Sequence, residues 1–307
     1  MSVKEPKVAT KKRKLAPSGS ALAALPWIGP ALILILAVVI WPVIELIRAS
    51  LTEISNAGSF HGFTGLTNFR DLIANPDLKP VIIRTLIWVA AIVFFTVILS
   101  LPLAQLINQK FPGRKFVRWA LIVPWAASVV MTSLIWKWIL NAYSGELNLT
   151  LDQLGLIKEP VDWMGDPKTS FYFLIWVAVF VSIPFTTFVL LAGLQSVPHD
   201  ILEAAWVDGA TSWQTYRRII FPLLRSSLLI ATIINLINVF NSFPIIWVMT
   251  KGGPGYDTDT TTTFAYKLAF IESNMGQSTA LGVINFLFIL IIVGFYLRVT
   301  KATRTEL

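Results

Sequence analysis

Six long stretches of this sequence contain no Asp, Glu, Lys or Arg, and this pattern constrains the fold more than any other feature. A helix needs about 20 mostly apolar residues to cross the ~30 Å hydrocarbon core of a bilayer, and five of the stretches reach that length. The third reaches it when extended to Leu140, with the Lys137 ammonium directed toward the membrane surface. The six stretches cover residues 15–44, 85–109, 119–136, 169–199, 226–250 and 273–297.

The composition supports membrane helices over the alternative, which is helices buried in a large soluble core. Hydrophobic residues make up 55% of the chain and charged residues 14%, against about 25% charged in ordinary soluble domains. A soluble core would need far more chain to cover six helices that are apolar all round. We therefore predict an all-α, polytopic membrane bundle over residues 21–307. Its spans are expected at about 23–46, 84–108, 118–140, 170–195, 226–250 and 275–298.

The first span is predicted to stay attached to the chain. Its apolar run is longer than the ~7–15 residues of a signal peptide core, and the only A-x-A sequence, at 21–23, precedes the run rather than follows it. Residues 1–20 form a basic tail before it. A shorter uncharged run at 54–69 contains His61, three Gly and two Asn, and it is predicted to be a loop.

The distribution of charge predicts the orientation. Sixteen of the 25 Lys and Arg residues lie on the side that holds both termini and the loops near 108–118 and 195–225. Because positive residues favour the cytoplasmic side, both termini are expected in the cytoplasm. The net charge of +8 is then a topology signal and a contact with anionic lipids. No nucleic-acid partner is expected, since the Lys-rich start has no interleaved aromatic residues and adjoins a span.

One cytoplasmic loop, residues 196–225, has a helix–Gly–helix pattern. Pro198 should end the fourth span, and Asp200 with Glu203 should form a capping box. Gly209 suits a left-handed helix end, and a second helix should run from Ser212 to just before Pro222. Ile201, Ala204, Ala205 and Asp208 share one helical face. Spacing alone leaves open whether this face binds a protein partner or lies on lipid.

Within this loop the sequence resembles the EAA loop of ABC importer permeases. The matching residues are Glu203, Ala204, Ala205, Asp208, Gly209, Ala210, Tyr216, Ile219 and Pro222. The resemblance implies a coupling helix that contacts a cytoplasmic ATPase dimer, with Glu203 to Ala210 as the contacting residues. Tyr216 stands where the family usually has Phe, and Arg225 stands where it often has Pro.

A second match follows the fifth span and resembles the sugar-importer branch of that family, of the maltose-type first permease. It consists of Gly252, Gly253 and Pro254, a Thr-rich stretch, Ala265–Tyr266 and Ala269–Phe270. The resemblance implies that this outer loop contacts an extracytoplasmic sugar-binding protein. Taken alone, Gly-Gly-Pro-Gly is also ordinary turn chemistry after a helix end.

The sequence carries no sign of catalysis by this chain. It contains no G-x-x-x-x-G-K-[ST] phosphate-binding loop, and its two histidines, His61 and His199, are expected on opposite sides of the membrane. It has no Cys, so thiol catalysis and Cys-ligated metals are excluded. We expect no metal site, no catalytic residue and no cofactor bound by this chain. The resemblance places ATP and Mg on partner ATPase subunits.

Polar side chains within the spans are candidates for a substrate path. Asn235, Asn238 and Ser242 have offsets of 0, 3 and 7 and are expected on one face of the fifth span. They fit either a path or hydrogen bonds between helices. Similarity to the maltose-type permease adds Ser182, Phe185 and Val239 as sugar-contacting positions. Val239 replaces an amide there, which argues against maltose itself.

These features together predict the permease subunit of an ATP-driven ABC importer in a bacterial or archaeal plasma membrane. A second permease, an ATPase dimer and a sugar-binding protein are the expected partners. The expected substrate is a disaccharide or oligosaccharide, with a glycerol-phosphate-like solute left open. The alternative is a secondary transporter or channel that works alone, and a structural membrane scaffold is a third class. The loop at 196–225 and the absence of acidic residues in the middle of the spans favour the importer.

Overall fold

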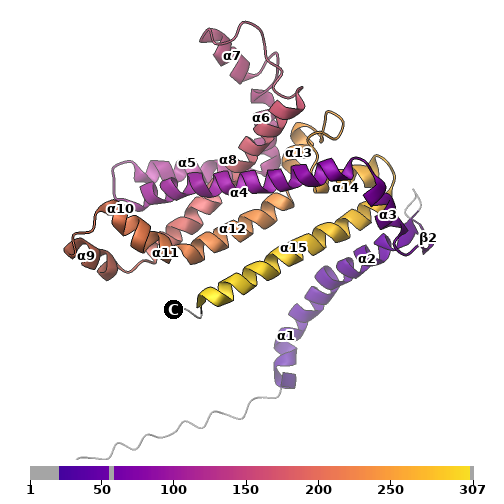
Figure 1. The fold of residues 1–307 in the computed structure, drawn as a ribbon, viewed down its shortest axis with the longest axis horizontal. Coiled ribbons are helices and arrows are strands. Elements are labelled where there is room, and N and C mark those ends of the chain that lie inside the picture. The colour runs from indigo at the N-terminus through magenta and orange to yellow at the C-terminus, as the bar shows by residue number, and fades with distance from the viewer. Residues whose placement is uncertain (1–20, 55–58, 305–307) are drawn as a thin grey trace, which may run out of the picture. The chain divides into compact units, whose positions relative to one another are not determined.

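The computed structural model describes residues 21–54 and 59–304 (Figure 1). The predicted tail at 1–20 lies outside the described residues. The chain separates into two compact units, with the boundary between Arg48 and Ala49.

The first unit is helical over all of its described length. Helix α1 (Ala21–Ile35) leads through a π-helical turn, η1 (Leu36–Ile40), into α2 (Trp41–Ser50). The π turn ends directly before Trp41 and Pro42. Because Pro lacks an N–H and its ring collides with the carbonyl four residues earlier, the wider turn accommodates it without a break. The segment Pro26–Ser50 is long and apolar enough to cross a membrane, close to the predicted first span.

The second unit is built on three helices that pack against one another. They are α4 (Leu78–Asn108), α8 (Pro167–Gln195) and α12 (Arg225–Phe240), seen together in Figure 1. Two apolar clusters lie between them. One cluster includes Trp88, Ile92, Leu174, Val179 and Phe240. The other includes Ala104, Ile107, Leu190, Leu194 and Leu224. A last long helix, α15 (Met275–Arg304), packs against α12, α14 (Thr261–Phe270) and α3 (Thr67–Ala74).

The predicted third span is not one straight helix. Helix α5 (Arg114–Ala126) and helix α6 (Val129–Ile139) meet at a bend of 98°, and Ala127 and Ser128 between them are extended. Pro124 in the last turn of α5 removes an amide from the helical ladder, which weakens the helix just before the bend. Helix α6 then packs on α13 (Pro244–Met249). In Figure 1 α5 runs alongside α4, whereas α6 points away from it. The segment predicted as a span at 118–140 therefore consists of two helices rather than one.

The predicted fifth span also ends earlier than expected. Helix α12 stops at Phe240, and α13 starts at Pro244 after three non-helical residues. The Asn241 side chain donates a hydrogen bond to the Ile237 carbonyl (3.0 Å) and so competes with the backbone at the helix end. Pro244 begins the next helix, where its missing N–H costs nothing. The segment predicted as a span at 226–250 therefore consists of two helices, α12 and α13.

The connections contain more regular structure than predicted. The 54–69 region, expected to be a loop, contributes to a two-stranded antiparallel hairpin of β1 (Thr52–Ile54) and β2 (Phe60–Phe63), followed by α3. Thr52 pairs with Phe63 and Ile54 with Phe60, with a register irregularity between Glu53 and Ile54. A short helix, α7 (Glu146–Gln153), lies between α6 and α8. Alternation and β-branched content are too weak in these segments to reveal them from sequence.

Four of the described helices can cross a membrane by length and composition, and up to six spans result if each bent pair is one span. The four are Pro26–Ser50, Leu78–Asn108, Pro167–Gln195 and Met275–Arg298. The bent pairs are Arg114–Ala126 with Val129–Ile139, and Ser212–Leu223 with Arg225–Phe240. Large apolar side chains stay exposed on these helices, such as Phe94 (58%), Ile291 (70%) and Phe295 (69%). A surface of this kind is stable only against lipid or a protein partner.

Candidate functional site

The segment predicted as a helix–Gly–helix, residues 196–225, is called the elbow from here on. Its first helix is α9 (His199–Val207). Gly209 adopts a left-handed φ of +73°. The amides of Gly209 and Ala210 donate to the carbonyls of Trp206 (3.1 Å) and Ala205 (3.0 Å). These bonds satisfy carbonyls at the helix end in the manner of a Schellman motif. The predicted left-handed end at Gly209 is confirmed.

The start of α9 differs from the prediction. Pro198 is the N-cap, Asp200 lies inside the first turn, and no side chain caps the helix. The predicted capping box of Asp200 and Glu203 is therefore wrong. Pro198 ends the preceding segment and its extended conformation starts the new helix two residues earlier than a capping Asp would. Asp200 still interacts favourably with the positive end of the helix dipole.

The second arm of the elbow is α10 (Ser212–Thr215), a π-helical turn η2 (Tyr216–Ile220) and α11 (Phe221–Leu223). A capping box does occur here, between Thr211 and Gln214. The Thr211 amide donates to Gln214 Oε1 (2.8 Å), and the Gln214 amide donates to Thr211 Oγ1 (3.3 Å). The arm was predicted to end before Pro222 but continues through it, because the π turn relieves the clash, as η1 does before Pro42.

Three of the four residues that spacing placed on one face of α9 are exposed, namely Ile201, Ala204 and Asp208. Ala205 is buried (5% exposed), while Glu203, Ala204 and Asp208 are exposed. The most exposed apolar side chains are Trp206 (70%), Val207 (88%) and Trp213 (68%). Sequence reasoning missed them, although three large apolar residues beside acidic and basic ones in a short loop were a visible signal. Exposed apolar surface rimmed by polar residues is typical of a docking site.

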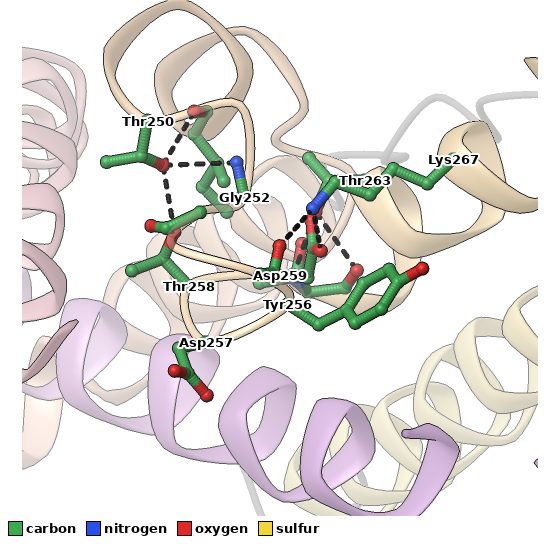
Figure 2. A network of polar contacts seen from close by, with 12 residues as sticks. Thr250, Gly252, Tyr256, Asp257, Thr258, Asp259, Thr263 and Lys267 are labelled. Carbon is green, nitrogen blue, oxygen red and sulfur yellow. Dashed lines mark hydrogen bonds and ion pairs between the residues drawn. The ribbon is translucent and has the colours of Figure 1, made fainter. Parts of the chain in front are cut away.

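The second candidate region is residues 250–260, called the Gly-rich loop, together with α14 that follows it (Figure 2). Gly252 has a φ of +77°, and any side chain there would collide with the carboxylate of Asp259. The Thr258 hydroxyl donates to the Gly253 carbonyl (2.9 Å) and lies 2.8 Å from the Thr250 hydroxyl. Gly252 is therefore needed to let the loop fold tightly on itself.

A buried ion pair holds this loop to α14. Lys267 Nζ lies 2.6 Å from Asp259 Oδ2 and donates to the Gly255 carbonyl (2.8 Å). The same ammonium lies 4.7 Å from the centre of the Tyr256 ring. The side chains of Lys267 and Asp259 are 8% and 0% exposed. Burial raises the pKa of Asp259 to about 6, and the Lys267 ammonium opposes that rise.

Arg84 of α4 ties the Gly-rich loop to the bundle. Its Nη2 donates to the Tyr256 carbonyl (2.6 Å), its Nε donates to the Asp259 carbonyl (3.4 Å), and its Nη1 lies 3.6 Å from Asp257. The Thr261 amide donates to the hydroxyl of Thr85, also on α4 (2.9 Å). Sequence reasoning selected Gly252, Gly253 and Pro254 but missed Arg84 and Lys267. Lys267 lies near the motif in sequence, within the Ala265–Phe270 part of the match, whereas Arg84 is 175 residues from Asp259 and only the fold brings it there.

The candidate path residues do not gather on one face. Asn235 is 3% exposed and its side-chain nitrogen has no hydrogen-bond partner, whereas Asn238 is exposed. Ser242 follows the end of α12, so the helical offset that grouped it with the other two does not hold. Val239 is buried, and its carbonyl accepts a hydrogen bond from Trp88 Nε1 (3.1 Å). The prediction of a common face is wrong because it assumed a helix that continues past Phe240.

Further buried polar groups lie on the helices that pack around Asn235. The hydroxyls of Thr96 on α4 and of Thr186 and Thr187 on α8 are buried and have no partner among the described residues. Ser182 and Phe185 are half-buried on the same helix, α8. Unsatisfied polar groups are costly in an apolar interior, so a concentration of them is expected where a polar ligand or water enters.

Known proteins are similar to this chain over most of its length. The family described as binding-protein-dependent transport system inner membrane component matches residues 96–305. A probable ABC transporter permease protein of Brucella suis is 40% identical over 277 residues, which is 90% of this chain and 95% of that protein. The trehalose/maltose transport system permease protein MalF of Thermococcus litoralis is 31% identical over 90% of this chain and 92% of its own.

A solved structure has a similar fold over most of the chain. It belongs to a bacterial alginate ABC transporter in complex with an alginate pentasaccharide-bound periplasmic protein. The match has a TM-score of 0.78 and 25% sequence identity, and it covers 90% of this chain and 92% of that one. The overall fold of this chain is therefore shared with a solved transporter.

Proposed function

This chain belongs to the family of binding-protein-dependent transport system inner membrane components and is the membrane-spanning permease subunit of an ABC sugar importer; we propose the assembly in which it works. A second permease completes the path, and a cytoplasmic ATPase dimer supplies the energy. An extracytoplasmic binding protein delivers the sugar. The cargo is a disaccharide or oligosaccharide, in keeping with the trehalose/maltose permease that the chain resembles.

The elbow is the site at which the ATPase docks. The observation that carries this proposal is the exposed apolar surface of Trp206, Val207 and Trp213 on a loop whose two arms are fixed by a Schellman end and a capping box. Glu203, Ala204, Asp208, Gly209 and Ala210 lie on or beside this surface, and Ala205 supports it from within. A rigid elbow transmits a displacement of its tip to α12, which begins directly after α11.

We further infer the orientation of the chain in the membrane and the places where its partners and the sugar bind. Both termini and the elbow lie in the cytoplasm, since most Lys and Arg residues are on that side. ATP and Mg are held by the partner ATPase, and this chain binds no cofactor. The Gly-rich loop, with Gly252, Gly253 and Pro254, lies outside and contacts the binding protein. The sugar passes along Ser182, Phe185, Asn235, Asn238, Val239 and Ser242.

The test is purification of the tagged full chain from its native membrane in gentle detergent, with mass spectrometry of the proteins that co-elute. A second permease and an ATPase are expected. Trp206→Ala should reduce the ATPase yield, because the apolar anchor is lost. Trp138→Ala is the matched control, since Trp138 is equally exposed (76%) but lies on α6. A stable chain that carries no ATPase would instead favour a transporter that works alone.

A further inference from the structure

A cavity of ≈ 410 Å³ lies at the outer end of the bundle, beside the Gly-rich loop. It differs from the larger apolar cavity between α4, α12 and α15, which only apolar side chains and Thr232 line. This outer cavity brings together charged groups and one aromatic ring from three segments. Its lining residues are Arg84, Asp166, Pro167, Lys168, Phe171 and Asp257.

The aromatic side of the cavity is fixed in place. The Phe171 ring packs against Trp88, with 6.1 Å between ring centres. Trp88 is fully buried and donates a hydrogen bond to the Val239 carbonyl. Phe171 is only half-buried, so part of its surface is free to contact a ligand. A ring held in this way binds at little entropic cost.

The polar side of the cavity has unused hydrogen-bonding capacity. Arg84 has five N–H donors, and its backbone contacts with the loop engage only Nη2 and Nε. Its Nη1 lies 3.6 Å from Asp257, which is too long for a direct hydrogen bond and suits a bridging hydroxyl or water. Figure 2 shows Asp257 directed away from the rest of the polar network.

Asp166 supplies an acceptor that is already ionised. Its Oδ2 accepts hydrogen bonds from the amide (2.8 Å) and the hydroxyl (2.9 Å) of Thr169 at the start of α8. These bonds hold the pKa of Asp166 below its ordinary value. The described contacts do not engage Oδ1. Two acidic and two basic residues line the cavity, so its charge is balanced at neutral pH.

From this juxtaposition we propose that the outer cavity is an entry subsite for one glycosyl unit of an uncharged sugar. The C–H face of the sugar ring lies on Phe171, and its hydroxyls bridge Arg84 and Asp257 and donate to Asp166. A hydroxyl both donates and accepts, which matches guanidinium and carboxylate groups set close together. The balanced charge favours a neutral sugar over a uronate. The inference rests on the sugar-import function and adds a first contact ahead of the path within the bundle.

The test measures saturation transfer by NMR from the full chain, with its co-purified partners in lipid nanodiscs, to maltose, trehalose and digalacturonate. We expect transfer to a neutral disaccharide, weaker transfer in Phe171→Ala because one of the sites that contact the sugar is lost, and wild-type transfer in Phe171→Trp. Tyr172→Ala is the matched control, because Tyr172 is the neighbouring aromatic residue on α8 and is 70% exposed. Asp257→Asn should weaken transfer while it preserves the side-chain shape.

Several results would overturn the subsite. The subsite is refuted if none of the three sugars receives saturation transfer, or if transfer is equal in wild type and Phe171→Ala. Transfer to digalacturonate alone would overturn the assignment to a neutral sugar. If Phe171→Ala keeps full transfer but loses ATPase stimulation by the binding protein, the cavity is a protein contact instead. Sugar-dependent ATP hydrolysis by the wild-type complex tests the import function separately, so the two ideas can fail independently.

Discussion

Replacement of Lys267 by Met should open the Gly-rich loop, because it leaves the Asp259 carboxylate buried without its cation. The ammonium and the carboxylate oxygen are 2.6 Å apart, and both side chains are shielded from water. Removal of one partner from such a pair costs about 3–5 kcal/mol. The Met side chain keeps the apolar stem but donates no hydrogen bond to the Gly255 carbonyl, which Lys267 Nζ reaches at 2.8 Å.

The assay is hydrogen exchange of loop amides in lipid nanodiscs. The amides of Thr258 and Asp259 donate to the carbonyls of Gly252 (3.2 Å) and Tyr256 (3.0 Å), so they exchange only when the loop opens. Since about 1.4 kcal/mol corresponds to a factor of ten, a loss of 3–5 kcal/mol makes them exchange about 100-fold to several thousand-fold faster. The amide of Gly155, bonded to the Asp152 carbonyl in another loop, should not change.

A double variant separates the charge effect from general damage. Asp259→Asn with Lys267→Met leaves no buried charge, so it should recover most of the protection that Lys267→Met loses. Equal exchange in wild type and Lys267→Met would refute the argument that the ion pair holds the loop. A double variant as open as the single one would show that packing, rather than charge, holds it.

Three further results are expected. Protection of the loop amides from hydrogen exchange should fall in wild type as pH rises through about 6, because the folded pKa of Asp259 is raised above its ordinary value. After correction for intrinsic exchange rates, Asp259→Asn should lose this pH dependence. Gly209→Pro should insert normally but abolish transport and sugar-stimulated ATPase activity, since Pro cannot adopt the φ of +73° that Gly209 has. Gly155→Pro is the control, because Gly155 has a φ of +69° in a different loop. Normal transport in Gly209→Pro would contradict coupling through the elbow. Asn235→Leu removes a buried side-chain amide whose nitrogen lacks a partner, so thermal unfolding in detergent should show the variant as stable as wild type or about 1–3 kcal/mol more stable. Its sugar uptake should fall, and full uptake would remove Asn235 from the path.

The sequence by itself was enough to locate the long helices α4, α8 and α15 and the elbow. Stretches free of charge mark where α4, α8 and α15 run, because only helices satisfy the backbone inside a bilayer. Gly209 marks the left-handed end of α9, because the backbone requirement there is local. Local chemistry of this kind, read over a few neighbouring residues, does not depend on what packs against it.

The tertiary structure decided where helices break and which distant residues meet. An unbroken helix over 118–140 was compatible with its apolar pattern, but α6 turns away at Ala127 and Ser128 to pack on α13. Arg84 meets the Asp259 carbonyl across 175 residues of sequence, and no local pattern encodes that partner. The outer cavity likewise exists only because α4, α8 and the Gly-rich loop converge. Periodicity reports which side of a helix is apolar, whereas contacts between distant segments depend on how the helices pack, and local patterns in the sequence do not reveal that packing.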